Sequence, residues 1–303
     1  MKFLLTMIFA PGFLTSEPVQ TAMIVGGGAA LVSGVVGVFA VMRGQSFAGH
    51  ALADVTSAGG AASFLLGINP LLGFLCMAVL AAGGMEAAGV RRIRERDLVT
   101  GIVLGAGLGV TALFLYLDVT LGSTTGAANM VMFGSMFAIP AETIPLALGV
   151  GLCALASVAV LYRPLLLSSL NPELAEARGL PLRLIGFLQL LALALAVSLS
   201  AMTIGAILST ALLIGPAATA LRVARRPGWA IVIAALVGLG ATWGGILLAY
   251  DSFYWTPGHG WPVSFFVVTL VFLAYLLASL SGRRGERTRD APSHSAPGAM
   301  GKA

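Results

Sequence analysis

The chain of 303 residues is 58% hydrophobic and only 10% charged, with a formal net charge of +5. Because soluble domains carry about 25% charged residues, this composition excludes an ordinary soluble enzyme or binding domain and predicts an all-α polytopic membrane protein. The basic residues are scattered between apolar runs and do not form a patch with aromatic side chains, so no nucleic-acid partner is expected.

Residues 1–17 are expected to form an N-terminal interfacial segment, because Pro11-Gly12 interrupts a short apolar run and no small-residue cleavage site follows it. The first crossing is placed at 18–42, which holds no charged residue and exceeds the roughly 20 apolar residues that span a bilayer. Residues 44–67 make the second crossing, and a third follows the turn signal Asn69-Pro70.

A short charged loop at 91–97 separates the third crossing from a fourth at 98–117, and a fifth is expected at 142–162. The next apolar run, 184–221, is uncharged throughout. As one helix it would be about 57 Å long, nearly twice the hydrocarbon thickness of a membrane. It is therefore expected to turn back near Thr203-Ile204-Gly205.

Residues 227–250 and 262–282 supply the last two crossings. Residues 283–303 are rich in Arg, Ser, Pro and Gly, and are expected to form a disordered cytoplasmic tail. The stretch 18–282 is thus expected to be one transmembrane domain, a bundle of about eight or nine helices of which some are short or broken. An eight-helix arrangement would require one apolar segment to be re-entrant.

Counting nine crossings places every Lys and Arg except Lys2 on one side of the membrane. By the positive-inside rule this side is the cytoplasm, so we expect a multi-pass protein of a bacterial-type plasma membrane with its C-terminus inside. The opposite loops then carry acidic residues, which would give a mildly negative outer face: Glu17, Asp118, Glu142 and Asp251.

His50 and Asp54 stand inside the second crossing. If that segment is helical, their four-residue spacing puts both side chains on one face. An ionisable side chain in hydrocarbon is costly and normally faces a partner, a cavity or a pathway. The pair could therefore hold a cation or relay a proton, and the alternative is a structural pair in which the imidazole merely satisfies the carboxylate.

A short helix is predicted in the cytoplasmic loop at 171–179, Asn-Pro-Glu-Leu-Ala-Glu-Ala-Arg-Gly. Asn171 is a residue type preferred at the N-cap, and Pro172 is one preferred at the first helical position. Gly179 is typical of the residue that ends a helix at its C-terminus. Such a helix is either an ordinary interfacial element or a docking site for a cytoplasmic partner.

Motifs for catalysis are missing from the chain, which has no Gly-x-x-x-x-Gly-Lys-Ser/Thr phosphate loop, no His-Glu-x-x-His helix and no Gly-x-Ser-x-Gly elbow. The protein is therefore not expected to be an enzyme, and energy for uphill transport must come from an ion gradient or a separate subunit.

Cys76 and Cys153 lie in apolar stretches and do not have the spacing of a metal or redox motif, so both are expected to be buried free thiols.

Three segments resemble the membrane permeases of ABC-type zinc and manganese uptake systems, the ABC-3 family: residues 43–52, 171–179 and 205–220. The resemblance implies a homodimeric permease bound to cytoplasmic ATP-binding subunits and fed by an extracytoplasmic metal-binding protein. It also implies that 168–181 is an ATPase-coupling segment. The residues that would make this coupling contact are Asn171, Pro172, Glu173, Leu174, Ala175, Ala177 and Gly179.

The chain departs from the family pattern at the ionisable pair. The family usually has aspartate first and histidine four residues later, followed by Leu-Pro-Gly. Here His50 takes the aspartate position, Asp54 takes the histidine position, and residues 56–59 replace the proline with Thr-Ser-Ala-Gly. Imidazole and carboxylate suit zinc or manganese, but two ligands cannot complete a coordination shell, so further donors or water are required.

His259 lies in an outer turn between two tryptophans and is a second candidate metal ligand. The simpler interpretation is that His259 is a residue of the membrane–water interface.

The sequence therefore predicts a permease subunit that passes Zn²⁺ or Mn²⁺ inward while a partner hydrolyses ATP, with no cofactor bound by this chain and with lipid around it. Three alternatives stay open. The chain could be a proton-coupled secondary transporter that uses His50 and Asp54 as a relay, an ABC permease for a different small cargo, or a structural membrane protein without cargo.

Overall fold

The computed structural model describes residues 12–87, 93–121, 126–255 and 260–289, and the regular structure in these ranges is entirely helical. The long helices are α2 Glu17–Met42, α3 Ser46–Leu66, α4 Pro70–Ala87, α5 Ile93–Leu121, α7 Ile144–Leu170, α9 Leu182–Ile204, α10 Ala206–Val223, α11 Pro227–Trp255 and α12 Val263–Arg289. The short ones are η1 Phe13–Thr15, α6 Ala127–Phe133, η2 Met136–Ala138, η3 Ala141–Thr143 and α8 Pro172–Ala177. The predicted all-α class is confirmed.

Within the described ranges, 8 helices are long and apolar enough to cross a membrane. The ninth long helix, α3, has 21 residues and includes the more polar sequence of the second predicted crossing. It lies inside the bundle, packed against α4, α5, α9 and α10. The expected bundle of eight or nine transmembrane helices is therefore confirmed, and the long helix that is not among the eight strongly apolar ones is an interior helix.

Prolines and glycines mark the helix boundaries. Pro70 and Pro227 stand at the first position of α4 and α11, where their missing N–H costs no hydrogen bond. Gly67 ends α3 with a φ of +64°, and Gly205 separates α9 from α10 with a φ of +88°. Both values lie in the left-handed region that favours glycine.

The break at Gly205 confirms that the long uncharged run turns back. A Cβ atom on Gly49 would lie 2.8 Å from a methyl of Leu213 on α10 and 3.8 Å from a methyl of Leu193 on α9. These two leucines stand on either side of Gly205 in the sequence and meet the same point on α3. The two helices therefore run back alongside each other, as the length of the run predicts.

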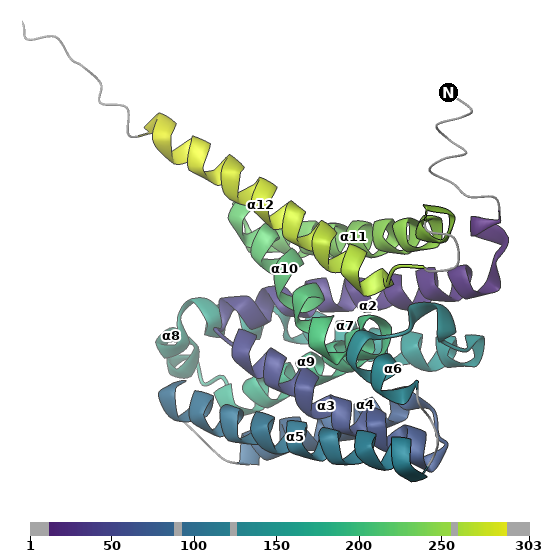
Figure 1. Ribbon diagram of the computed structural model, residues 1–303. Helices are drawn as coiled ribbons and strands as arrows, with labels where there is room; N and C mark the ends of the chain where they lie inside the picture. Colours follow the sequence, from purple (N-terminus) through teal and green to yellow (C-terminus); the bar gives the residue numbers. More distant parts are fainter. Residues whose placement is uncertain (1–11, 88–92, 122–125, 256–259, 290–303) are drawn as a thin grey trace, which may run out of the picture.

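Helices α4 and α5 both pack closely on α3, and the three helices form one side of the bundle, at the bottom of Figure 1. Gly59 and Gly73 let the backbones of α3 and α4 touch, since a Cβ on either residue would lie about 2 Å from the carbonyl oxygen of the other. This group meets the remaining helices mainly where α4 contacts α9 and where α3 contacts α9 and α10.

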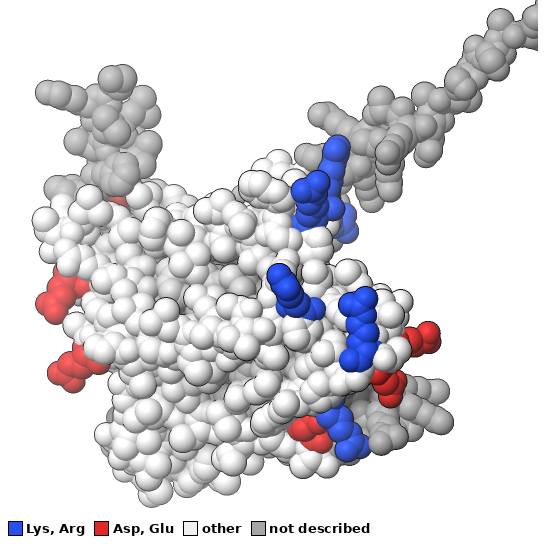
Figure 2. Space-filling model, turned by 180° about the vertical axis from the view of Figure 1, so that it is seen from behind, with Lys and Arg blue, Asp and Glu red and all other residues white. Residues whose placement is uncertain are grey.

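Charge is divided between the two ends of the bundle. On the face that Figure 2 shows, the described Lys and Arg side chains gather at one end together with some acidic ones. The charged residues described at the other end are acidic, and an uncharged band lies between the two ends. The basic end is the one where α8 lies, and the chain enters the first helix at the opposite end (Figure 1). This distribution matches that of a protein whose central band lies in hydrocarbon.

Two of the acidic residues predicted for outer loops are instead buried inside helices, so that prediction was wrong. Helix α5 continues to Leu121, which places Asp118 within the helix at 0% exposure, and neither carboxylate oxygen has a hydrogen-bond partner there. Helix α11 continues to Trp255 and holds Asp251 at 3% exposure. Only Glu17 and Glu142 of the four remain exposed.

Several boundaries also differ from the predictions. Helix α12 runs to Arg289, past the expected start of the tail at residue 283, while residues 290–303 lie outside the described part of the chain. The predicted loop 91–97 is helical from Ile93 onward. Most of the predicted N-terminal segment, residues 1–11, also lies outside the described part of the chain.

Cys76 and Cys153 are free thiols as expected, but both are exposed on the bundle surface and not buried.

Candidate functional site

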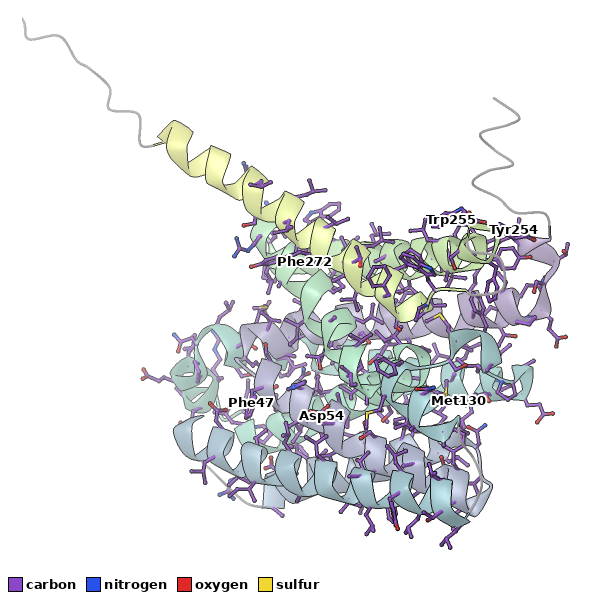
Figure 3. The ribbon with its side chains drawn as sticks, viewed as in Figure 1. Phe47, Asp54, Met130, Tyr254, Trp255 and Phe272 are labelled. Atoms are coloured by element: carbon purple, nitrogen blue, oxygen red, sulfur yellow. The ribbon has the colours of Figure 1, made fainter. Side chains whose placement is uncertain are left out.

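A tight turn leads from α2 into α3. Gly44 has a φ of +64° in this turn, and the backbone N–H of Gln45 donates to the carbonyl of Ala40 at 2.8 Å. Helix α3 then begins at Ser46 and runs without interruption to Leu66. Figure 3 shows Phe47 toward the α8 end of the bundle and Asp54 nearer its middle, while Tyr254 and Trp255 lie toward the other end.

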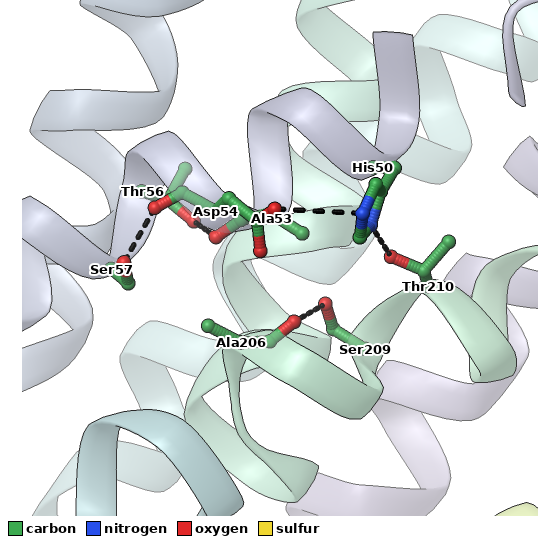
Figure 4. Close-up of polar contacts among 8 residues, drawn as sticks. All are labelled: His50, Ala53, Asp54, Thr56, Ser57, Ala206, Ser209 and Thr210. Carbon is green, nitrogen blue, oxygen red and sulfur yellow. Dashed lines mark hydrogen bonds and ion pairs between the residues drawn. The ribbon is translucent and has the colours of Figure 1, made fainter. Parts of the chain in front are cut away.

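His50 and Asp54 lie one turn apart on α3, as predicted, and their side chains face each other (Figure 4). The distance from His50 Nε2 to Asp54 Oδ2 is 3.5 Å. That separation exceeds the 2.7–3.2 Å of an ordinary hydrogen bond. No short hydrogen bond therefore closes the pair. When Nδ1 carries the ring proton, the Nε2 electron pair and the carboxylate can both be used by a third partner such as a cation.

The other nitrogen of His50 makes a contact that spacing in the sequence does not predict. Nδ1 lies 3.0 Å from Oγ1 of Thr210 on α10 (Figure 4). A hydrogen bond on one imidazole nitrogen orients the ring and determines which role the other nitrogen can take. Thr210 thus holds the His50 ring so that Nε2 points at the carboxylate.

The polar residues that follow the pair are engaged with the backbone and with α5. Thr56 donates to the carbonyl of Ala53 at 2.8 Å, and Ser57 donates to the carbonyl of Asp54. The Ser57 hydroxyl also lies 2.8 Å from the Thr111 hydroxyl on α5. None of these hydrogen bonds involves the Asp54 carboxylate, so they do not occupy its oxygen atoms.

The two members of the pair differ in exposure. The His50 side chain is 44% exposed in the single chain, whereas that of Asp54 is 13% exposed. Among the described residues, no cluster of three or more His, Cys, Asp or Glu side chains could hold a metal ion. One chain therefore contributes two candidate donors at this place, and the partly open histidine is the member that a further partner can reach.

His259, the other candidate ligand, lies outside the described residues. Trp261 beside it stacks on Phe266 with a centroid distance of 6.0 Å, and Trp255 meets Phe266 edge-on at 6.4 Å. The surrounding aromatic residues are typical of the membrane–water interface. Further along α12, Phe272 is exposed on the outer surface of the bundle (Figure 3).

The predicted short helix in the loop before α9 is present as α8. Asn171 caps it by accepting a hydrogen bond from the N–H of Leu174 at 2.9 Å, and Pro172 begins it. Gly179 follows it with a φ of +72°. Every residue from Asn171 to Gly179 is exposed except Ala175, which is fully buried and seats the helix on the bundle.

A polar contact joins the turn before α3 to the helix that precedes α8. The guanidinium of Arg43 donates from Nη1 to the Ser168 hydroxyl at 2.7 Å. Ser168 lies in the last turn of α7, three residues before the cap of α8. The pair-bearing helix and the exposed surface helix are therefore connected at the basic end of the bundle.

Sequence reasoning missed Thr210, which lies 3.0 Å from His50, and two buried glutamines, Gln45 before α3 and Gln189 on α9. Thr210 lies within the segment 205–220, which was singled out only for its resemblance to the family. Gln189 is the one amide side chain in the uncharged run 184–221. The prediction for this run depends on its length and its lack of charge. A neutral amide side chain changes neither property, so Gln189 does not stand out in the sequence.

The sequence pattern of the ABC 3 transport family matches residues 15–280. The chain belongs to the ABC 3 transport family. Among proteins of related sequence, the manganese transport system membrane protein MntC of Listeria monocytogenes is 26% identical over 284 residues, covering 94% of this chain and 99% of MntC. The high-affinity zinc uptake system membrane protein ZnuB of Haemophilus influenzae is 29% identical over 231 residues, covering 73% of this chain and 85% of ZnuB.

A solved structure supports the same assignment to the ABC 3 transport family. A chain of PsaBC from Streptococcus pneumoniae, determined in complex with Fab, matches with a TM-score of 0.78 and 26% sequence identity. The match covers 92% of this chain and 98% of the PsaBC chain. The structural similarity therefore extends over nearly the whole bundle.

Proposed function

We propose that the chain is the membrane-spanning permease subunit of an ATP-driven importer for a divalent transition metal ion, manganese or zinc. The observation that carries the proposal is the His50–Asp54 pair, held by Thr210 in a polar helix inside a bundle of the ABC 3 transport family. An imidazole nitrogen and a carboxylate oxygen are ligands that both metals accept. MntC is named for manganese transport and ZnuB for zinc uptake, which supports this choice of cargo.

We infer that two copies of the chain form a homodimer around the cargo path. At this place the described part of one chain offers two side-chain donors, too few for a tetrahedral or octahedral shell. A two-fold axis beside α3 would bring together two histidines and two aspartates, because an isologous interface repeats each residue. The 44% exposure of the His50 side chain supports this arrangement, since a polar ring in the hydrocarbon zone requires a partner.

The energy for import would come from a separate ATP-binding subunit, because this chain has no phosphate loop. The capped, exposed helix α8 at the basic end is the proposed contact for that subunit, with the residues from Asn171 to Gly179 as its surface. By the positive-inside rule that end, and the C-terminus with it, would face the cytoplasm. An extracytoplasmic metal-binding protein would then deliver the ion to the opposite, acidic end.

Uptake of Mn²⁺ and Zn²⁺ by cells that express the complete transporter tests the proposal. Asp54→Asn keeps the shape and removes the charge, and His50→Ala removes the nitrogen donors, so each should reduce uptake strongly without reducing the amount of inserted protein. The double variant His50→Asp with Asp54→His keeps both ligand types on one helical face and should retain part of the transport. Parental uptake of both metals in all three variants would refute the assignment.

The secondary-transport alternative makes a different prediction for the same pair. A proton relay would let the permease alone, without any ATP-binding subunit, accumulate cargo in proteoliposomes that carry a proton gradient. For an ATP-driven importer, collapse of that gradient by an ionophore should leave uptake intact, and removal of ATP should abolish it. The two measurements together separate the mechanisms.

A further inference from the structure

Three arginines lie close together where α10 passes into α11, at the basic end of the bundle. Arg222 stands in the last turn of α10, and Arg225 and Arg226 follow it in the short connection before Pro227 begins α11. All three side chains are exposed. The connection therefore presents a dense group of positive charge on the surface.

No acidic residue of the surrounding helices balances these charges. The sequence has no Asp or Glu at 177–250 or at 263–285, so α10, nearly all of α11 and the apolar part of α12 lack acids. Within the described part of the chain, the guanidinium groups of Arg225 and Arg226 make no hydrogen bond or ion pair. Their counter-charge must therefore come from outside the chain.

Arg222 is held against α12 by neutral partners. Its Nη2 donates to the Tyr275 hydroxyl at 2.8 Å and its Nη1 donates to the Ser279 hydroxyl at 3.0 Å. The central carbon of the guanidinium also lies 4.8 Å from the centroid of the Tyr275 ring. These contacts fix the orientation of the group but do not neutralise it, and a guanidinium has further N–H donors to offer.

The depth of the arginines is that of the boundary between hydrocarbon and headgroups. The apolar part of α12 that can lie in a membrane ends at Leu280, next to the Ser279 that Arg222 contacts. Beside the charges, Trp229 is 60% exposed and Leu277 is 65% exposed. An exposed tryptophan is typical of the membrane–water interface, and exposed leucines are typical of a surface that faces acyl chains.

This surface lies on the opposite side of the bundle from the ionisable pair. Helix α12 packs on α10 and α11, and Figure 1 shows α11 and α12 at the top of the bundle while α3, α4 and α5 lie at the bottom. A second copy placed beside α3 would therefore not cover the three arginines. Lipid is the partner that reaches exposed apolar and cationic side chains on this side.

We propose that Arg222, Arg225 and Arg226 bind the headgroup phosphate of an anionic phospholipid, whose acyl chains lie along the exposed leucines of α12. The planar guanidinium pairs well with phosphate oxygens, and the fixed orientation of Arg222 favours one binding geometry. Because the arginines are uncompensated, a lipid with net negative charge is preferred over a zwitterionic one. The site does not depend on the cargo, and the proposed orientation places it in the inner leaflet.

Native mass spectrometry of the full-length permease tests the site, with phosphatidylglycerol and phosphatidylethanolamine supplied in equal amounts. The parental protein should retain phosphatidylglycerol in preference. Arg225→Gln with Arg226→Gln should weaken this preference by roughly tenfold or more. The matched control is Arg163→Gln with Arg183→Gln, which removes two exposed arginines from α7 and α9 and should keep the preference.

The single variants Arg225→Gln and Arg226→Gln serve if the double variant does not insert, and each should weaken the preference by roughly fivefold. A parental protein without preference overturns the lipid site, and so does an equal loss in the control. Displacement of the lipid by inorganic phosphate would show a general anion site and would also overturn it. If the double variant keeps the lipid but loses the copurifying ATP-binding subunit, the arginines contact that subunit instead. Metal uptake is not measured in this test, so its outcome is separate from that of the proposed function.

Discussion

The Arg43 guanidinium and the Ser168 hydroxyl, 2.7 Å apart, join the turn that precedes the pair-bearing helix α3 to the last turn of α7. Because α8 begins at Pro172, four residues after Ser168, this hydrogen bond lies between the surface helix and the start of α3. The bond therefore connects the proposed site of ATPase contact with the proposed cargo path.

Ser168→Ala should partly uncouple ATP hydrolysis from import. A net contribution of about 0.5–1.5 kcal/mol for the lost hydrogen bond corresponds to a fall in uptake of roughly two- to tenfold. ATP hydrolysis by the assembled transporter should continue, so more ATP is used per ion. Ser169→Ala is the matched control, because the Ser169 hydroxyl donates to the Leu165 carbonyl of its own helix. An equal effect in both variants would show that Arg43 has no special part in coupling.

Thr210→Val should weaken transport through the orientation of His50. The substitution keeps the side-chain shape but removes the oxygen that lies 3.0 Å from Nδ1, so the imidazole ring can rotate away from Asp54. We expect uptake to fall by about two- to tenfold while the amount of inserted protein stays the same. Thr210→Ser retains the hydroxyl and should restore most of the uptake. If valine and serine behave alike, the hydroxyl does not position the ring.

Gly59→Ala should destabilise the bundle where α3 and α4 touch. The new Cβ would lie 2.0 Å from the carbonyl oxygen of Gly73, so the two helices would have to separate. Overpacking of this kind costs about 1–3 kcal/mol, which thermal denaturation in detergent can detect. Gly83→Ala on α4 is the control, since no atom lies within 4 Å of its added Cβ. A parental melting temperature for Gly59→Ala would show that this contact tolerates separation.

Features governed by local chemistry or by length were predictable from the sequence. The turn at Gly205 follows from a run too long for one crossing, and α8 follows from a cap, an N-terminal proline and a glycine stop. The four-residue spacing of His50 and Asp54 likewise predicts their shared face. Each of these inferences depends only on residues close together in the chain.

Features that depend on packing between distant segments were not predictable. The contact between His50 and Thr210 joins residues 160 positions apart, and no spacing rule reaches that far. The charge of Asp118 predicts the end of a crossing, yet α5 continues past it and packing excludes it from water. Gln189 is a neutral residue in a long apolar run, so the sequence gives no reason to single it out. Its burial without a hydrogen-bond partner, which is unusual for an amide, becomes visible only in the structure.

The exposed surface of α8 offers the sharpest test of partner binding. Leu174 is 41% exposed and Ala177 is also exposed, so neither contributes much to the stability of the bundle. The double variant Leu174→Glu with Ala177→Glu should therefore insert and fold normally. If α8 docks an ATP-binding subunit, two buried charges at that interface should abolish copurification of the subunit and remove ATP-dependent uptake.

Asn171 and Ala175 supply the controls for the same helix. Asn171→Ala removes the cap on the Leu174 N–H, which is worth about 1 kcal/mol, so α8 should fray and the subunit should bind more weakly without being lost. Ala175→Glu places a charge at a fully buried position, so it should lower the amount of folded permease as well as the binding. Selective loss of the subunit from a folded Leu174→Glu, Ala177→Glu permease is thus the result that identifies a docking surface. Normal ATP-dependent uptake in that variant would mean that the ATP-binding subunit contacts the permease elsewhere.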